Sequence, residues 1–265
     1  MEMITKTNFS NKSKSISHPF NWEIPPNRVS IKPGDVHIWK VDLKVIASHQ
    51  DAAKILSTDE RERAARIIDP LRRGRFRSAR FALRNILSIY KYLSPEAIEL
   101  SYGKYGKPFI KQKDLKCSIS FNITHSTNLM LVALSNSCQV GIDLEKEHSI
   151  TTKEWIIKQY FSQKDSYFFR HLPGEERLSA FLLLWTLKEA HAKALGSGFA
   201  AAPDLDFSEL DHHCDLRLNR MVIYPKEDFW FLCFSPYKGF VASAAVLTNV
   251  SPVPRFYSYK CESET

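Results

Sequence analysis

Val140-Gly141-Ile142-Asp143-Leu144-Glu145 is a stretch of alternating residues that predicts a β-strand with two chemically different faces. Side chains two apart in a strand share a face, so Asp143 and Glu145 point to one side. Ile142 and Leu144 point to the other side, where they can be buried. The alternation therefore predicts a strand that carries two carboxylates on one face.

A second stretch, Trp185 to Lys193, predicts a helix whose polar stripe can complement that strand. Residues four apart in a helix share a face, so Trp185, Glu189 and Lys193 lie in one stripe. The apolar run from Phe181 to Leu184 precedes them and indicates that this part of the helix is buried. A buried carboxylate is costly unless a cation or a hydrogen-bond donor compensates it.

The two stretches together supply three carboxylates and a lysine. Mg²⁺ is a hard cation that prefers carboxylates combined with phosphate oxygens. The set therefore predicts chemistry on a phosphate ester. These four residues alone do not separate a transferase from a metal-dependent nuclease, because both could use them.

The composition is typical of a folded protein without a membrane segment. The chain has 265 residues, of which 44% are hydrophobic and 25% charged, enough for one large domain or two small ones. No apolar run approaches the about 18 residues that span a bilayer, and residues 1–14 lack the apolar core of a signal peptide. The five cysteines are scattered and form no CxxC pair, which argues against a disulfide framework or a zinc ribbon. We expect a cytoplasmic protein that does not bind a membrane.

Positive charge is concentrated in one part of the chain, whose formal net charge is +8. Nine arginines fall within 24 residues: Arg61, Arg63, Arg66, Arg72, Arg73, Arg75, Arg77, Arg80 and Arg84. The planar guanidinium suits phosphate, so the stretch is expected to attract a polyanion such as nucleic acid, a nucleotide cofactor or an acidic protein. The alternative is a solvated helix face with acidic neighbours.

The expected organisation is two α+β halves with a segment at each end. The segments are a flexible N-terminal arm over 1–28, an N-terminal half over 29–146, a C-terminal half over 147–250 and a C-terminal tail over 251–265. Both halves show a long helix followed by strands, and 126–134 resembles 236–244. This echo indicates either an internal repeat or a chance likeness of two buried strands.

Periodicity and breakers predict the individual elements. Pro70 is expected to separate the first two helices, and the second should leave Arg77, Arg80 and Arg84 available on faces away from its apolar side. The predicted helices are 57–68, 72–92, 152–160, 164–171 and 175–195. The predicted strands are 36–43, 98–102, 108–110, 118–123, 129–135, 140–145, 216–218, 229–234 and 240–248.

Three smaller motifs contain residue types that can bind ligands. His125 follows a predicted strand beside two hydroxyl residues, so it could reach a phosphate. Asp211-His212-His213-Cys214-Asp215 is read as a polar loop, because adjacent residues rarely converge on one ion. Gly196-Ser197-Gly198 has the letters of a dinucleotide-binding turn but follows a helix, so that interpretation fails.

The ordered motifs resemble those of the Sfp-type 4'-phosphopantetheinyl transferases. Six segments in the family's order carry the likeness, over roughly residues 57–200. They are Tyr105-Gly106-Lys107-Pro108, Phe121-Asn122-Ile123-Thr124-His125-Ser126, Val140 to Glu145, Tyr160-Phe161-Ser162, Trp185 to Lys193 and Gly196-Ser197-Gly198.

The resemblance implies an α+β pseudo-dimer of two similar halves, each a small antiparallel sheet packed against a long helix, with the active site at the interface. It implies transfer of the 4'-phosphopantetheine of coenzyme A to a serine hydroxyl of an acidic apo acyl or peptidyl carrier protein. The implied products include 3',5'-ADP, and the implied metal is Mg²⁺. A monomer without a nucleic-acid partner is expected.

The resemblance also implies residue roles. Asp143, Glu145 and Glu189 would hold the metal, while Glu189 and Lys193 would be catalytic. The implied cofactor-binding residues are Arg63, Arg77, Lys107, Pro108, Thr124, His125, Lys188 and Lys193. Glu60 departs from the pattern, since some relatives carry a basic residue there.

Two other functions are compatible with parts of the sequence. A metal-dependent nuclease could use the same acids and grip a nucleic-acid backbone with the arginines, although these lack interleaved exposed aromatics for base stacking. A non-catalytic carrier-binding protein could keep the fold, but it would have no need of Glu189 and Lys193.

Overall fold

The structure is a computed structural model that describes residues 16–26, 28–46, 52–111, 119–147, 153–174, 176–199, 205–207 and 220–260. Its helices are α1 (Leu43–Ile46), α2 (Ala52–Ile55), α3 (Thr58–Ala65), α4 (Pro70–Lys91), α5 (Lys153–Tyr160), α6 (Gln163–His171) and α7 (Arg177–Leu195), with a 3₁₀ turn, η1, at Pro95–Ala97. Its strands are β1 (Ile16–Pro19), β2 (Asp35–Asp42), β3 (Leu100–Tyr102), β4 (Pro108–Ile110), β5 (Ile119–Ser126), β6 (Leu129–Asn136), β7 (Val140–Lys146), β8 (Arg220–Lys226), β9 (Phe229–Phe234), β10 (Phe240–Leu247) and β11 (Val253–Ser258).

The strands form two main sheets and one hairpin. The antiparallel five-stranded sheet has the order β1-β8-β9-β10-β7. The four-stranded sheet has the order β11-β2-β6-β5, in which only the β11–β2 pair is parallel. Strands β3 and β4 pair separately. The predicted α+β class with small antiparallel sheets is confirmed.

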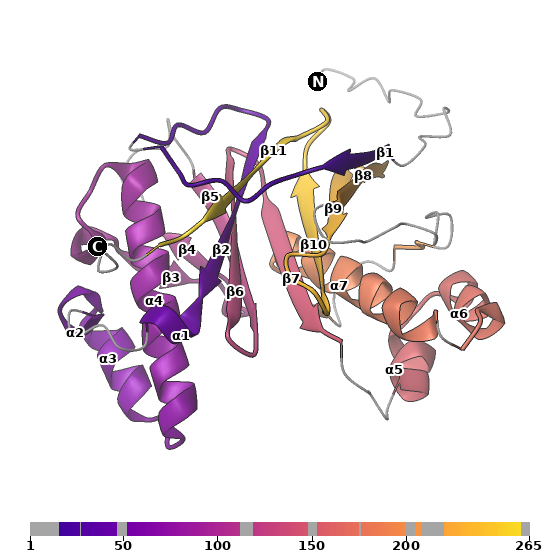
Figure 1. The fold of residues 1–265 in the computed structure, drawn as a ribbon, viewed down its shortest axis with the longest axis horizontal. Helices are drawn as coiled ribbons and strands as arrows, with labels where there is room; N and C mark the ends of the chain where they lie inside the picture. The colour runs from indigo at the N-terminus through magenta and orange to yellow at the C-terminus, as the bar shows by residue number, and fades with distance from the viewer. Residues whose placement is uncertain are drawn as a thin grey trace.

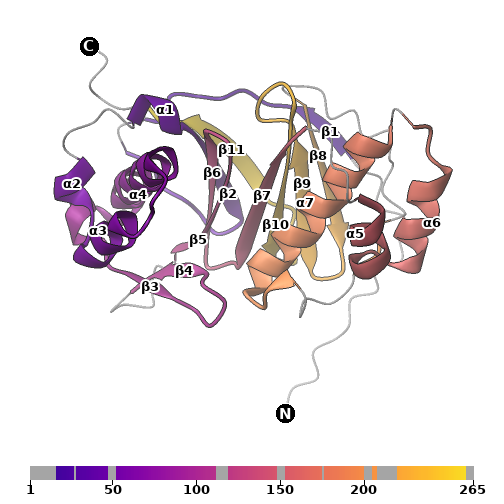
Figure 2. The same cartoon turned by 90° about the horizontal axis from the view of Figure 1, so that it is seen from below.

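The molecule is layered, with helices outside and sheets inside (Figure 1). Helix α4 packs on the outer face of the four-stranded sheet, and α7 packs across β7 and β10 of the other sheet (Figure 2). A third core fills the space between the sheets and contains Val140, Ile142 and Leu144 of β7. The alternation predicted for this strand is therefore confirmed. Within the described ranges, no helix combines the length and the apolar character needed to cross a membrane.

The start of helix α4 differs by two residues from the sequence prediction. Asp69 caps the helix by accepting hydrogen bonds from the amides of Leu71 at 2.8 Å and Arg72 at 3.4 Å. Pro70 follows as the first helical residue, a position where its missing N–H costs nothing. The predicted break between the two helices is confirmed, but Pro70 is the first residue of α4 and lies two residues before the predicted start of that helix.

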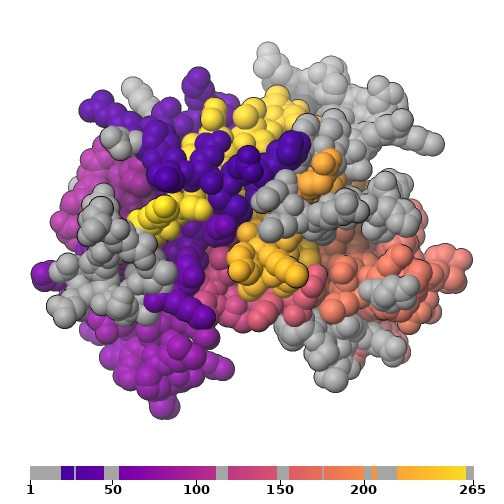
Figure 3. Space-filling view, in the orientation of Figure 1, coloured from indigo at the N-terminus to yellow at the C-terminus, as the bar shows by residue number. Residues whose placement is uncertain are grey.

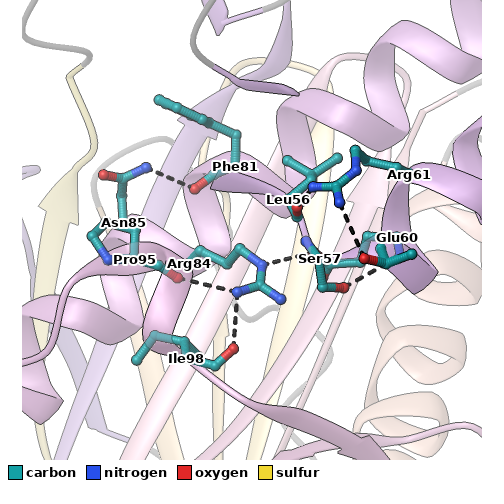
Figure 4. A network of polar contacts seen from close by, with 10 residues as sticks. Leu56, Ser57, Glu60, Arg61, Phe81, Arg84, Asn85, Pro95 and Ile98 are labelled. Atoms are coloured by element: carbon teal, nitrogen blue, oxygen red, sulfur yellow. Dashed lines mark hydrogen bonds and ion pairs between the residues drawn. The ribbon is translucent and has the colours of Figure 1, made fainter. Parts of the chain in front are cut away.

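The arginines of α4 are not all available for an anion. Arg84 is only 2% exposed, and its Nε donates to Glu60 Oε2 at 2.7 Å (Figure 4). Its Nη1 also donates to the carbonyls of Pro95 and Ile98. Arg80 is buried too. The expectation that both would be available is wrong.

Glu60 therefore has a structural partner in this protein. Its side chain accepts from the Ser57 amide, while the Ser57 hydroxyl accepts from the Glu60 amide, which forms a capping box at the start of α3. Together with the ion pair to Arg84, this ties α3 to α4. The local structure accounts for an acid at this position.

Each main sheet includes a strand from the opposite end of the chain. β1 pairs with β8, and β11 pairs with β2, within the segments predicted as an arm and a tail. The connection between β1 and β2 runs beside β11, where Glu23 bridges to Tyr257 and Phe20 packs on Phe256 with ring centroids 4.2 Å apart. Residues from the two ends adjoin on one face of the molecule (Figure 3). The sequence prediction missed both strands.

Most other elements agree with the prediction, and β4 and β9 match it residue for residue. Strand β8 was missed, as were the short helices α1 and α2. The predicted strand over 216–218 and the polar loop over 211–215 lie outside the described residues. The division into arm, halves and tail stays a prediction.

Candidate active site

Asp143 is the centre of a polar cluster between β7, β5 and α7. Its carboxylate is 5% exposed. Oδ1 accepts from Lys193 Nζ at 2.5 Å and from Thr124 Oγ1 at 3.2 Å. Oδ2 is buried and has no hydrogen-bond partner among the described residues. An orphaned carboxylate oxygen beside a lysine marks a place where a further positive charge or donor would be stabilised.

Gly141 explains how α7 comes so close to β7. A Cβ atom at this position would overlap the carbonyl oxygen of Ala190 and the amide nitrogen of Ala194. Gly141 lies on the same face of the strand as Asp143, two residues away. The missing side chain therefore lets the helix backbone rest on the strand and brings the side chains of α7 to Asp143.

The partly exposed stripe of α7 is the one predicted from the sequence. Trp185, Glu189 and Lys193 are each half-buried, whereas every other residue of the helix from Phe181 to Ala194 is buried. Gly196 ends the helix in the left-handed conformation, with φ of 66°. The stripe prediction is confirmed, and it explains how Glu189 and Lys193 share the vicinity of Asp143.

Glu189 has an unusual protonation equilibrium. Burial raises its pKa, the nearby Lys193 ammonium lowers it, and the Asp143 carboxylate raises it again. The net direction is upward. A carboxylate with a raised pKa is a better proton acceptor near neutral pH than an ordinary glutamate.

The predicted three-carboxylate metal set is assembled only in part. Glu145 is half-buried on the α7-facing side of β7, two residues after Asp143. Within the described ranges, no three acidic, histidine or cysteine side chains are grouped closely enough to hold a metal ion. The donor chemistry nevertheless fits a hard cation, because these are carboxylates and one buried Asp143 oxygen has no hydrogen-bond partner in the described part of the chain.

Strand β5 supplies the third side of the cluster. Thr124 contacts Asp143 directly, and the exposed His125 follows it. Asn122 was not singled out from the sequence, yet its Oδ1 accepts from the Ile142 amide at 3.0 Å. This bond joins β5 to β7 where the two main sheets meet. The feature of the sequence that could have indicated this role is the amide side chain of Asn122 within the Phe121–Ser126 motif.

Lys188 lies apart from this cluster. It is buried, donates to the Leu205 carbonyl at 2.8 Å and forms an ion pair with Asp165 at 3.1 Å. Asp165 also accepts from the Phe207 amide. Lys188 thus connects α7 to α6 and to 205–207, and the structure does not bring it to Asp143. Asp165 follows the Tyr160-Phe161-Ser162 motif by three residues, and its pairing with Lys188 was not predicted from the sequence.

The remaining predicted cofactor-binding residues lie on α3, on α4 and at the start of β4. Arg63 and Arg77 are exposed on α3 and α4, and the Arg63 guanidinium lies 5.5 Å from the ring centroid of Phe76. Pro108 is buried at the start of β4, and Lys107 precedes it. Burial lowers the pKa of Lys107 to about 8. Its ammonium donates to the backbone carbonyls of Val140 and Ala194.

Comparison with known proteins identifies the family of the chain. The sequence model of the 4'-phosphopantetheinyl transferase superfamily matches residues 139–248, which include β7 and α7. The chain is 34% identical over 188 residues to the 4'-phosphopantetheinyl transferase HetI of Nostoc sp., covering 71% of this chain and 79% of HetI. It is 30% identical over 176 residues to the 4'-phosphopantetheinyl transferase Sfp of Bacillus subtilis, covering 61% and 74%. It is 36% identical over 103 residues to the transferase gsp of Aneurinibacillus migulanus, covering 39% and 40%.

The fold and the site define a mixed α+β enzyme in which acidic and lysine side chains meet between a strand and a long helix. The chain belongs to the 4'-phosphopantetheinyl transferase superfamily and is an enzyme of that class.

Proposed function

We propose that the protein transfers the 4'-phosphopantetheine of coenzyme A to a serine hydroxyl of an apo acyl or peptidyl carrier protein, with Mg²⁺, and releases 3',5'-ADP. The observation that supports this most is the contact of Lys193 with Asp143 beside Glu189, whose pKa is raised. The names of the relatives support the same reaction class.

The reaction forms a bond from the serine oxygen to phosphorus and breaks the pyrophosphate bond to 3',5'-ADP. Glu189 accepts the serine proton, directly or through water, and Lys193 stabilises negative charge on the phosphate. Asp143, Glu145 and Glu189 would hold Mg²⁺, which neutralises charge on the pyrophosphate when bound. Thr124 orients Asp143 by its hydrogen bond.

The architecture proposed with this function is a pseudo-dimer. A long helix is followed by antiparallel strands twice along the chain. Each series ends in a strand that pairs in the other sheet: β7 after α4, and β11, within the segment predicted as a tail, after α7. The site then takes Thr124 and Asp143 from one half and Glu189 and Lys193 from the other. The net charge of +8 favours encounter of a cytoplasmic monomer with acidic carriers.

The reaction is tested by incubating the protein with coenzyme A, Mg²⁺ and several apo carrier proteins, followed by mass spectrometry of the carriers. We expect one phosphopantetheine per modified carrier. A folded protein that modifies none of them contradicts the proposal. Parallel incubations with DNA and RNA test nuclease activity, which none of the relatives supports.

Glu189→Gln should abolish transfer, because the amide cannot accept the serine proton and no longer contributes a charged ligand. The fold should persist, since glutamine has nearly the same shape. Initial rates and circular dichroism check both points. The control is Glu176→Gln, an exposed residue just before the same helix, which should leave the rate unchanged. Near-normal turnover of Glu189→Gln would show that the site is misplaced.

A further inference from the structure

Lys107 connects three parts of the molecule through its ammonium group. The residue ends the loop between β3 and β4. Its Nζ donates to the carbonyl of Ala194 at 2.9 Å, to the carbonyl of Val140 at 3.1 Å and to Gln139 Oε1 at 3.4 Å. Ala194 belongs to the last turn of α7, where the unsatisfied carbonyls and the helix dipole favour a cation.

The rest of the loop packs on the segment that ends α7. The ring of Tyr105 would lie 3.2 Å from a Cβ atom at Gly198, and the Lys107 side chain 3.6 Å from one at Gly196. Both glycines have positive φ values. The loop and the end of α7 therefore form a close junction, and residues with larger side chains would disturb it.

This junction lies next to the site along both elements. Ala194 directly follows Lys193, and Val140 precedes Asp143 by three residues on β7. A single ammonium thus ties the start of the strand that carries Asp143 to the last turn of the helix that carries Lys193. Burial lowers the pKa of Lys107, as expected of an ammonium enclosed by protein atoms.

We propose that Lys107 is a positioning residue for the reaction: it sets the spacing between β7 and α7, and through it the contact of Lys193 with Asp143. This role rests on the proposed transferase function, and it differs from the cofactor-binding role implied by resemblance. In this structure the ammonium is directed to backbone carbonyls of the protein.

The test separates catalysis from coenzyme A binding in Lys107→Met. The positioning role predicts that kcat falls about 10- to 100-fold, because small displacements of reacting groups are costly. The dissociation constants of coenzyme A and 3',5'-ADP, measured by calorimetry, should stay close to those of the unsubstituted protein. Lys107→Arg keeps a cationic donor and should recover part of kcat. Lys104→Met, an exposed residue in the same loop, is the control and should change neither quantity.

A role in holding a phosphate predicts the opposite pattern, with both nucleotides bound about tenfold or more weakly. Hydrogen exchange provides a readout without turnover: Lys107→Met should speed exchange of the amide of Gly196, which donates to the Ala192 carbonyl at the end of α7. Weaker nucleotide binding with unchanged kcat, or unchanged exchange at this amide, overturns the proposal. If the unsubstituted protein modifies no carrier, the proposed function fails, whereas the exchange result still decides whether the junction exists.

Discussion

Two histidines outside the site are buried where a charged imidazole is unfavourable. His37 Nδ1 forms a hydrogen bond of 2.8 Å with the Tyr90 hydroxyl. His191, on α7, packs edge-on against Phe229 with ring centroids 4.7 Å apart. Burial lowers the pKa of each to about 4. Both are therefore neutral in the folded protein near neutral pH.

This burial predicts acid sensitivity of the free energy of unfolding. Between pH 6.5 and about pH 4 the unfolded chain protonates both histidines, while the folded protein does not. The unfolded state binds more protons, so the free energy of unfolding falls as the pH falls through this window. Each histidine contributes on the order of 3 kcal/mol to that loss.

Replacing one of these histidines tests the prediction. His191→Phe should make the decline in stability between pH 6.5 and pH 4 shallower, because phenylalanine cannot be protonated and its ring can keep the contact with Phe229. Urea unfolding at several pH values measures the slope. His171→Gln, on the exposed side of α6, should leave it unchanged. An unaltered slope for His191→Phe would contradict this origin of acid sensitivity.

The relative positions of the site residues could be predicted where they follow the period of one helix or one strand. The four-residue repeat placed Glu189 and Lys193 together, and the two-residue repeat placed Asp143 on the face toward them. Lys188 shows the limit, because one residue before Glu189 turns the side chain by about 100° around a helix. Its partner Asp165 comes from another helix, which no local period reveals.

At the scale of elements, the contact between β7 and α7 depends on the absence of a side chain at Gly141. Gly141→Ala should lower the free energy of unfolding by about 1–3 kcal/mol or more, because the new methyl group meets helix backbone that cannot move aside easily. Transfer activity should fall with it, since α7 must shift relative to Asp143. Thermal unfolding and initial rates measure the two effects.

Gly74 provides the matched control for this substitution. It lies within α4, and a Cβ atom there would meet nothing within 4 Å. Gly74→Ala should therefore raise the free energy of unfolding by about 0.5–1 kcal/mol through helix propensity. If Gly141→Ala were as harmless as Gly74→Ala, the close approach of β7 and α7 would not be essential.

The existence and type of most elements followed from periodicity, but their ends depended on capping that patterns describe less well. Asp69 and Pro70 form a good helix start, although a proline between two helical patterns equally suggests a break. Strand β8 was missed because Met221 to Tyr224 form a short, continuously buried apolar run between β1 and β9, and such a run has no alternating period.

At the scale of the whole molecule, the exchanged terminal strands join the two sheets into one structure. Phe256 of β11 is buried against Phe20, Trp22 and Phe234, which come from the opposite end of the chain and from β9. The contacts of Phe256 with Phe20 and Trp22 link residues more than two hundred positions apart. No local pattern encodes them, and for this reason the arm and tail were predicted without strands.

Phe256→Ala should lower the free energy of unfolding by about 3–5 kcal/mol, the usual cost of removing a buried phenylalanine. The exchanged strands β1 and β11 still pair with β8 and β2 in this variant, so unfolding should remain a single transition. Calorimetry and tryptophan fluorescence, to which Trp39 of β2 and Trp230 of β9 both contribute, should report the same midpoint. A variant in which fluorescence and heat absorption separate would show that the two sheets unfold independently.

The exchange of strands also determines whether two fragments of the chain can associate. A break between β7 and α5 gives an N-terminal piece that holds β1 and β7, both edge strands of the five-stranded sheet, and a C-terminal piece that holds β11 of the four-stranded sheet. Neither piece carries all the strands of its own sheet, and each carries what the other lacks. Co-expressed pieces should therefore reassemble. The connection between β7 and α5 is thus a site at which the protein can be divided into complementing fragments, and the recovered transferase activity would report their association.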